Sequence, residues 1–129
     1  MEKKILHTSQ APSAIGPYSQ AIRIGSFLYT SGQIALNPDT MEMMNSTIEE
    51  ETEQVLKHIE AILKADNMNM DHVIKTTVYL TDLNEFSKMN QVYEKFFEET
   101  KPARACVQVA ALPKGAKVEI DAIAARHED

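Results

Sequence analysis

Apolar residues recur at helical spacing through 48–63, directly after two residues that can cap a helix. Ser46 and Thr47 each have a glutamate three residues later, which is the arrangement of a capping box. The pattern therefore predicts a helix that begins near residue 47 and fades near 66–67.

A second apolar stripe with helical spacing covers 86–97. Asp82 precedes it with Glu85 three residues on, and Lys101-Pro102 closes it, since the residue before a proline disfavours helix. We expect a second helix here.

The remaining regular segments are rich in β-branched and aromatic residues. They predict strands at 5–7, 21–25, 27–33, 72–80, 103–110 and 117–125. Gly25-Ser26 marks a hairpin turn, and the loop 112–115 is expected to join the last two strands as a second hairpin. The predicted order is β-β-β-α-β-α-β-β, an α+β fold in a single domain over 1–129.

Alternation along the last two strands predicts two different sheet faces. Ala105 and Val107, together with Val118 and Ile120, are expected to lie under the helices. The opposite face then carries a mixed set of side chains, namely Arg104, Cys106, Glu119, Ile123 and Ala125. A face that is half apolar and half charged indicates that another subunit covers it.

If the last two strands pair symmetrically about their loop, Arg104 and Glu119 lie roughly 13 Å apart along the hairpin. That separation is too large for one small-molecule site. Two copies that meet at an interface can bring the two side chains together, so the pattern points to shared sites.

The charge balance narrows the class of protein. The formal net charge is −6, and no run of lysine or arginine occurs, which argues against a nucleic-acid surface. Cys106 is the single cysteine, so an internal disulfide is excluded and a reducing compartment fits. Residues 1–7 turn polar before a signal-peptide core forms, and no apolar stretch approaches a membrane span. We expect a cytoplasmic protein that binds neither membrane nor nucleic acid.

Three motifs give the sequence its most specific signal. Gly16-Pro17-Tyr18-Ser19-Gln20-Ala21, Ser31-Gly32-Gln33-Ile34, and Pro102-Ala103-Arg104-Ala105-Cys106-Val107 followed by Val118-Glu119-Ile120 resemble the reactive-intermediate deaminase (RidA/YjgF) family over essentially the whole chain. The resemblance implies a chorismate-mutase-like fold and a homotrimer whose sheets form a central barrel with clefts between neighbours. It also implies hydrolysis of 2-iminopropanoate and 2-iminobutanoate to 2-oxo acids and ammonia, with no metal or organic cofactor.

The resemblance also implies residue roles. Arg104 matches the arginine that anchors the substrate carboxylate, which suits a guanidinium fork. Glu119 matches an acidic residue that orients or activates the attacking water. Tyr18 matches a tyrosine that lines the pocket, and Ser31 with Gly32 matches a strand end that approaches the ligand. Alternative interpretations remain open: an ion pair for Arg104, a surface or structural carboxylate for Glu119, and a packed ring for Tyr18.

Two further residues complete the predicted site. Asn90 lies on the second helix, opposite much of its apolar stripe, and is expected to reach the cleft. Cys106 lacks a histidine in any recognisable nucleophilic arrangement. It matches a family position with mainly backbone contacts, so we expect it to line the pocket without acting as a nucleophile.

The histidines lack metal-ligand spacing, and His58 is expected on the exposed side of its helix. The main alternative function is a non-catalytic module that binds or senses 2-oxo or imino acids, for which Arg104 serves equally well. A ribonuclease or translation inhibitor is disfavoured by the acidic balance, and a chaperone-like role leaves little trace in sequence.

Overall fold

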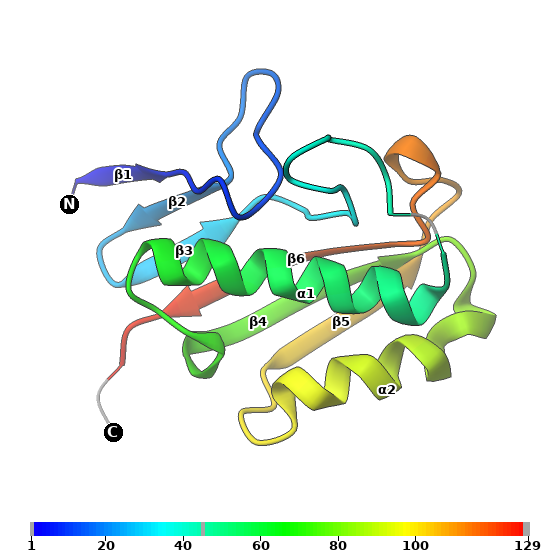
Figure 1. Cartoon of the computed structure of the whole chain (residues 1–129). Coiled ribbons are helices and arrows are strands. Elements are labelled where there is room, and N and C mark those ends of the chain that lie inside the picture. The colour runs from blue at the N-terminus through cyan, green and yellow to red at the C-terminus, as the bar shows by residue number, and fades with distance from the viewer. Residues whose placement is uncertain (1, 45, 128–129) are drawn as a thin grey trace.

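The computed structural model describes residues 2–44 and 46–127, and in this part of the chain two helices lie on one face of a six-stranded sheet (Figure 1). The strands are β1 (Lys3–Leu6), β2 (Ala21–Ile24), β3 (Phe27–Thr30), β4 (Val73–Leu80), β5 (Ala103–Gln108) and β6 (Val118–Ala125). The helices are α1 (Ile48–Ala65) and α2 (Phe86–Phe97), with short 3₁₀ turns at Met70–His72, Leu83–Glu85 and Pro113–Gly115. This order confirms the predicted α+β fold.

The strands follow the order β1-β2-β3-β6-β4-β5 across the sheet. The prediction that the last two strands form a hairpin is wrong, because β4 lies between β5 and β6. α2 is a crossover that returns the chain to run parallel to β4, as parallel neighbours require. The loop after β5 then carries the chain past β4, and β6 inserts antiparallel between β3 and β4.

α1 begins where its capping residues predict. The Thr47 side chain accepts a hydrogen bond from the Glu50 N–H, and acidic residues occupy the first turn. One side of α1 packs into the core with residues including Val55, Leu56, Ile59 and Ile62. In the part of the chain that is described, no helix is both long and apolar enough to cross a membrane.

A buried carboxylate fixes the start of β6 against α1. Glu51 is fully buried, and its Oε1 accepts the Lys117 N–H at 2.9 Å while Oε2 lies 3.5 Å from Lys117 Nζ. A buried carboxylate is stable only with such partners. The contact ties the first turn of α1 to the residue that precedes β6, two positions before Glu119.

His58 is buried, so the expectation that it lies on an exposed helix side is wrong. The segment around Leu36 passes over this side of α1, and His58 Nε2 lies 2.8 Å from the Leu36 carbonyl oxygen. Burial lowers the pKa of His58, although the hydrogen bond to Leu36 opposes the shift. Among residues 2–44 and 46–127, no three metal-ligating side chains cluster.

Candidate active site

Arg104 lies on the helix-covered face of the sheet, at its edge. It pairs in register with Thr76 of β4, so both side chains leave the sheet on the same face. Thr76 is buried there, whereas Arg104 is exposed because β5 is the edge strand. The expectation that Arg104 shares the uncovered face with Glu119 is wrong. The register of β5 with β4 decides which face of the sheet Arg104 occupies, and the alternation of residues within β5 alone does not reveal that register.

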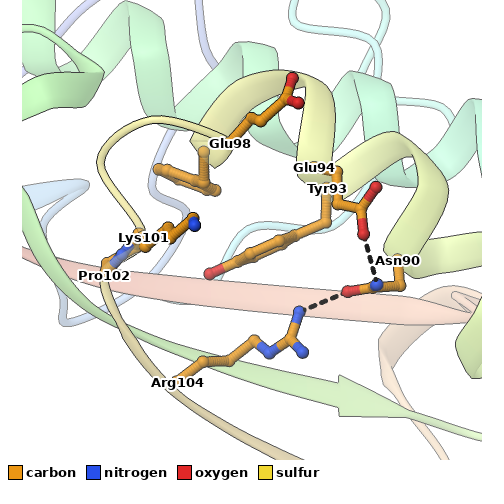
Figure 2. Close-up of a pocket in the computed structure, with 8 residues that line it drawn as sticks. Asn90, Tyr93, Glu94, Glu98, Lys101, Pro102 and Arg104 are labelled. Carbon is orange, nitrogen blue, oxygen red and sulfur yellow. Dashed lines mark hydrogen bonds between the residues drawn. The ribbon is translucent and has the colours of Figure 1, made fainter.

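The guanidinium of Arg104 is held by three side chains of α2. The central carbon of the guanidinium, Cζ, lies 4.7 Å from the ring centre of Tyr93 and 5.3 Å from the ring centre of Phe86. Nη1 donates to Asn90 Oδ1 at 2.7 Å, and Asn90 Nδ2 donates in turn to Glu94 Oε1 at 3.2 Å (Figure 2). Asn90 therefore reaches Arg104 from the second helix, but from the same helix face as Phe86 and Tyr93, so the expectation that it lies opposite the apolar stripe is wrong.

Arg104 and its partners on α2, except Phe86, border a cavity of about 580 Å³. Its lining residues come from α2, from the turn after it and from β5, and they are Asn90, Tyr93, Glu94, Phe97, Glu98, Lys101, Pro102 and Arg104. None of the ion pairs found among residues 2–44 and 46–127 involves Arg104. The guanidinium fork thus faces a cavity with donors suited to a carboxylate.

A second cavity, of about 380 Å³, lies elsewhere on the chain and is lined by three of the other predicted residues. Tyr18 reaches it from the loop before β2, Gly32 from the segment after β3, and Glu119 from β6. Apolar side chains form much of the remaining wall, including Ile15, Ile34, Leu36 and Met41. This cavity combines a carboxylate and a phenol in apolar surroundings.

The Glu119 carboxyl is half-buried, and burial raises its pKa above the usual value; the nearby Asp121 carboxylate adds to the increase. Gly32 leaves the space that the Glu119 carboxylate occupies. A β-carbon on Gly32 would overlap Oε2 of Glu119 and lie 2.8 Å from its carboxyl carbon. The absence of a side chain at Gly32 therefore lets the carboxylate lie against the backbone after β3.

Tyr18 is exposed on the loop before β2, and Ser31 forms a hydrogen bond to that loop. Tyr18 is 54% exposed, and its N–H donates to the Gly16 carbonyl at 2.9 Å in a tight turn. Gly16 has φ +123°, a conformation that favours glycine. The Ser31 hydroxyl donates to the Ser19 carbonyl, so it fastens the loop that carries Tyr18.

Cys106 borders neither cavity. Its side chain leaves β5 on the same face as Arg104 and packs against the core. Burial raises the pKa of its thiol, and the Arg104 charge only partly opposes this increase. The thiol is therefore poorly suited to act as a nucleophile at neutral pH.

Arg104 and Glu119 cannot serve one small ligand within a single chain. Their registry partners on β4, Thr76 and Tyr79, are three residues apart, and one strand separates β5 from β6. Strand spacing of about 4.8 Å and a rise of about 3.3 Å per residue place the two backbones roughly 14 Å apart. The side chains also leave opposite faces, because Thr76 is buried under the helices and Glu119 pairs with Tyr79 on the other side.

The face of the sheet that bears Glu119 also exposes apolar side chains. Phe27 and Tyr29 of β3 are 43% and 44% exposed, and Val107 of β5 is 44% exposed. Ile5 and Ile24 extend the same face towards β1. Ile24 pairs in register with Phe27, so the apolar side chains of β1–β3 lie next to one another, and an exposed apolar patch of this kind marks an interaction site.

Sequence reasoning missed the two aromatic residues beside Arg104. Phe86 and Tyr93 were assigned to the apolar stripe of the second helix, which explains their spacing equally well. The available signal was Asn90, because residues 86, 90 and 93 share one helix face and a polar residue between two rings is unusual there.

Known proteins resemble the chain along nearly its whole length. The sequence profile described as endoribonuclease L-PSP matches residues 8–126. The mouse 2-iminobutanoate/2-iminopropanoate deaminase is 46% identical over 122 residues, which is 95% of this chain and 90% of the relative. A RutC family protein of Pyrococcus abyssi is 48% identical over 124 residues, 96% of this chain and 98% of the relative. The crystal structure of E. coli TdcF with bound serine has 45% identity and a TM-score of 0.90, with 96% of this chain and 99% of that chain covered.

Proposed function

Because the chain belongs to the endoribonuclease L-PSP (RidA/YjgF) family, we propose that it is a deaminase that hydrolyses 2-imino acids to 2-oxo acids and ammonia. The substrates that we propose are 2-iminobutanoate and 2-iminopropanoate, for which the mouse relative is named. The main structural support is the Arg104 guanidinium, which faces a cavity and takes part in no ion pair among the described residues. The serine bound to TdcF is likewise a small molecule with a carboxylate beside a nitrogen.

We propose that the active assembly is a homotrimer in which the uncovered sheet faces meet. Because β5 is the edge strand, Arg104 of one copy would reach around the rim of this contact to Glu119 and Tyr18 of its neighbour. Two observations support this arrangement: the two half-sites lie on opposite faces of one chain, and the face that bears Glu119 exposes Phe27, Tyr29 and Val107. Burial of these apolar side chains would stabilise the assembly.

The proposed reaction has two steps. Arg104 binds the substrate carboxylate, and Glu119 accepts a proton from a water molecule whose oxygen attacks the imine carbon. The imine nitrogen takes up a proton from solvent as the water adds, which gives the carbinolamine. Protonated Glu119 then returns its proton to this nitrogen, the C–N bond breaks while the hydroxyl becomes the carbonyl and releases its proton to solvent, and the 2-oxo acid and ammonia leave. The raised pKa of Glu119 suits this role, because a base with a pKa closer to neutral accepts a proton more readily. In this proposal Tyr18 holds the water or donates a hydrogen bond to the imine nitrogen.

The test of this function uses 2-iminobutanoate generated in place from threonine by a dehydratase. Formation of 2-oxobutanoate is followed while semicarbazide competes for the imine. The wild type is expected to accelerate hydrolysis, and Arg104→Ala to lose about 10- to 100-fold in kcat/KM, the cost of a charge-assisted contact. Lys95→Ala is the matched control, since it removes an exposed cation from α2 outside the cavity.

Absence of acceleration by a correctly assembled wild type would favour the non-catalytic binding module. Cleavage of RNA by the same preparation would instead favour the activity in the family's description. The net charge of −6 makes this second outcome the less expected one.

Gly32→Ala is expected to lower kcat about 10- to 100-fold, because a carboxylate displaced by about 1 Å no longer holds the water in line. The new methyl group would overlap the end of the Glu119 side chain, which can swing aside. The melting temperature should therefore change little. A crystal structure of the variant together with its kcat checks this prediction, and an unmoved carboxylate with full activity would contradict it.

A further inference from the structure

The aromatic rings of α2 give Arg104 an unusual setting for an exposed arginine on an edge strand. Phe86, Asn90 and Tyr93 all contact its guanidinium, two through ring faces and one through a hydrogen bond of 2.7 Å. Figure 2 shows the Tyr93 ring lying between Arg104 and the turn that carries Lys101. A long side chain at such an edge would otherwise sample many rotamers.

Tyr93 is itself fixed in place, which makes it a rigid support. Its side chain is buried, and its hydroxyl lies 2.7 Å from Thr76 Oγ1. Its ring packs against Phe97 with the ring centres 4.7 Å apart. Thr76 is the registry neighbour of Arg104, so the Tyr93 hydroxyl reaches the strand beside the arginine, while burial and the contact with Phe97 keep the ring in place.

We propose that Tyr93 is a positioning residue for carboxylate recognition, because its ring face holds the Arg104 guanidinium in the orientation that binds the substrate. The proposal rests on the function proposed above and adds a residue to that site. The ring supplies the cation–π contact and is kept in place by its packing, so the hydroxyl is not required for the positioning role. Preorganisation of Arg104 lowers the entropy that is lost when the carboxylate binds.

This division of roles predicts different results for three variants. Tyr93→Leu removes the ring and should raise the dissociation constant for 2-oxobutanoate, and the KM, about 3- to 30-fold with kcat within about twofold. Tyr93→Phe keeps the ring and should bind like the wild type. Thr76→Val removes the same hydrogen bond from the other side, so it controls for any loss of stability.

The first measurement needs no ligand. The Nε–H signal of Arg104, assigned by its absence in Arg104→Lys, reports the order of the guanidinium through its ¹⁵N heteronuclear NOE. We expect a rigid signal in the wild type, in Tyr93→Phe and in Thr76→Val, and a mobile one in Tyr93→Leu. An unchanged NOE in Tyr93→Leu, or equal mobility in Tyr93→Phe, would overturn the positioning role.

Binding of 2-oxobutanoate by calorimetry and the split between KM and kcat complete the test. A wild type with a rigid Arg104 that neither binds 2-oxobutanoate nor hydrolyses imines would reject the proposed function, and with it the role of Tyr93 in recognition. The contact between the Tyr93 ring and Arg104 would remain established. Normal binding by Tyr93→Leu in an active enzyme would reject the positioning role alone.

Discussion

Glu119→Gln is expected to lower kcat for imine hydrolysis about 10²- to 10⁴-fold, the range for loss of a general base. Glutamine has nearly the same shape but cannot accept the proton that the attacking water must release. Binding of 2-oxobutanoate should persist, since the carboxylate anchor Arg104 is untouched. Steady-state kinetics and calorimetry on the assembled variant check both halves of the prediction.

The dependence of activity on pH provides a second test of Glu119 as the base. Burial, and then the charge of Asp121, raise the pKa of Glu119, and a base works only when ionised. Activity should therefore fall as pH drops through this raised pKa, and the acidic limb of kcat/KM should lie above the range of an ordinary glutamate. Glu119→Gln should lose that limb.

Asp121→Asn is the matched variant, because it removes the neighbouring charge and keeps the shape of the side chain. Without that charge the pKa of Glu119 falls, so the acidic limb should move to lower pH with little change in the plateau. An acidic limb that survives unchanged in Glu119→Gln would assign the ionisation to another group and remove Glu119 from the role of base.

The elements of the fold were predictable because each has a local signal. Thr47 caps α1 as its spacing with Glu50 indicates, and the stripe over 86–97 is α2. Strand order has no such signal. Two strands joined by a short loop resemble a hairpin, and only the position of β4 between them reveals that Arg104 and Glu119 leave opposite faces.

The candidate site was predictable only in its parts. Arg104, Glu119, Tyr18 and Gly32 were identified through the family resemblance, and the structure distributes them between two cavities. The contact of Tyr93 with Arg104 was hidden because an aromatic residue on an apolar stripe reads as core, and Tyr93 is also buried. Burial of His58 was missed for a similar reason: the segment that covers it lies 22 residues away in sequence.

Two inactive variants are expected to restore activity to each other when they assemble together. Arg104→Ala lacks the carboxylate anchor, and Glu119→Gln lacks the base. If each site takes Arg104 from one copy and Glu119 from the next, a site is intact wherever a Glu119→Gln copy supplies Arg104 to an Arg104→Ala neighbour. In a closed head-to-tail ring refolded from equal amounts, about one quarter of the sites meet this condition.

The measurement compares each variant refolded alone with the equimolar mixture, after native mass spectrometry has established that mixed assemblies form. Glu119→Gln mixed with Gly32→Ala is the matched control, because both changes fall in the cavity that one chain contributes. In that mixture every site carries one defect or the other, so it should show no more activity than the mean of the two variants. Mixed assemblies of Arg104→Ala and Glu119→Gln that stay inactive would mean that the site is not shared, and the separation of Arg104 from Glu119 would then leave Arg104 outside the catalytic centre.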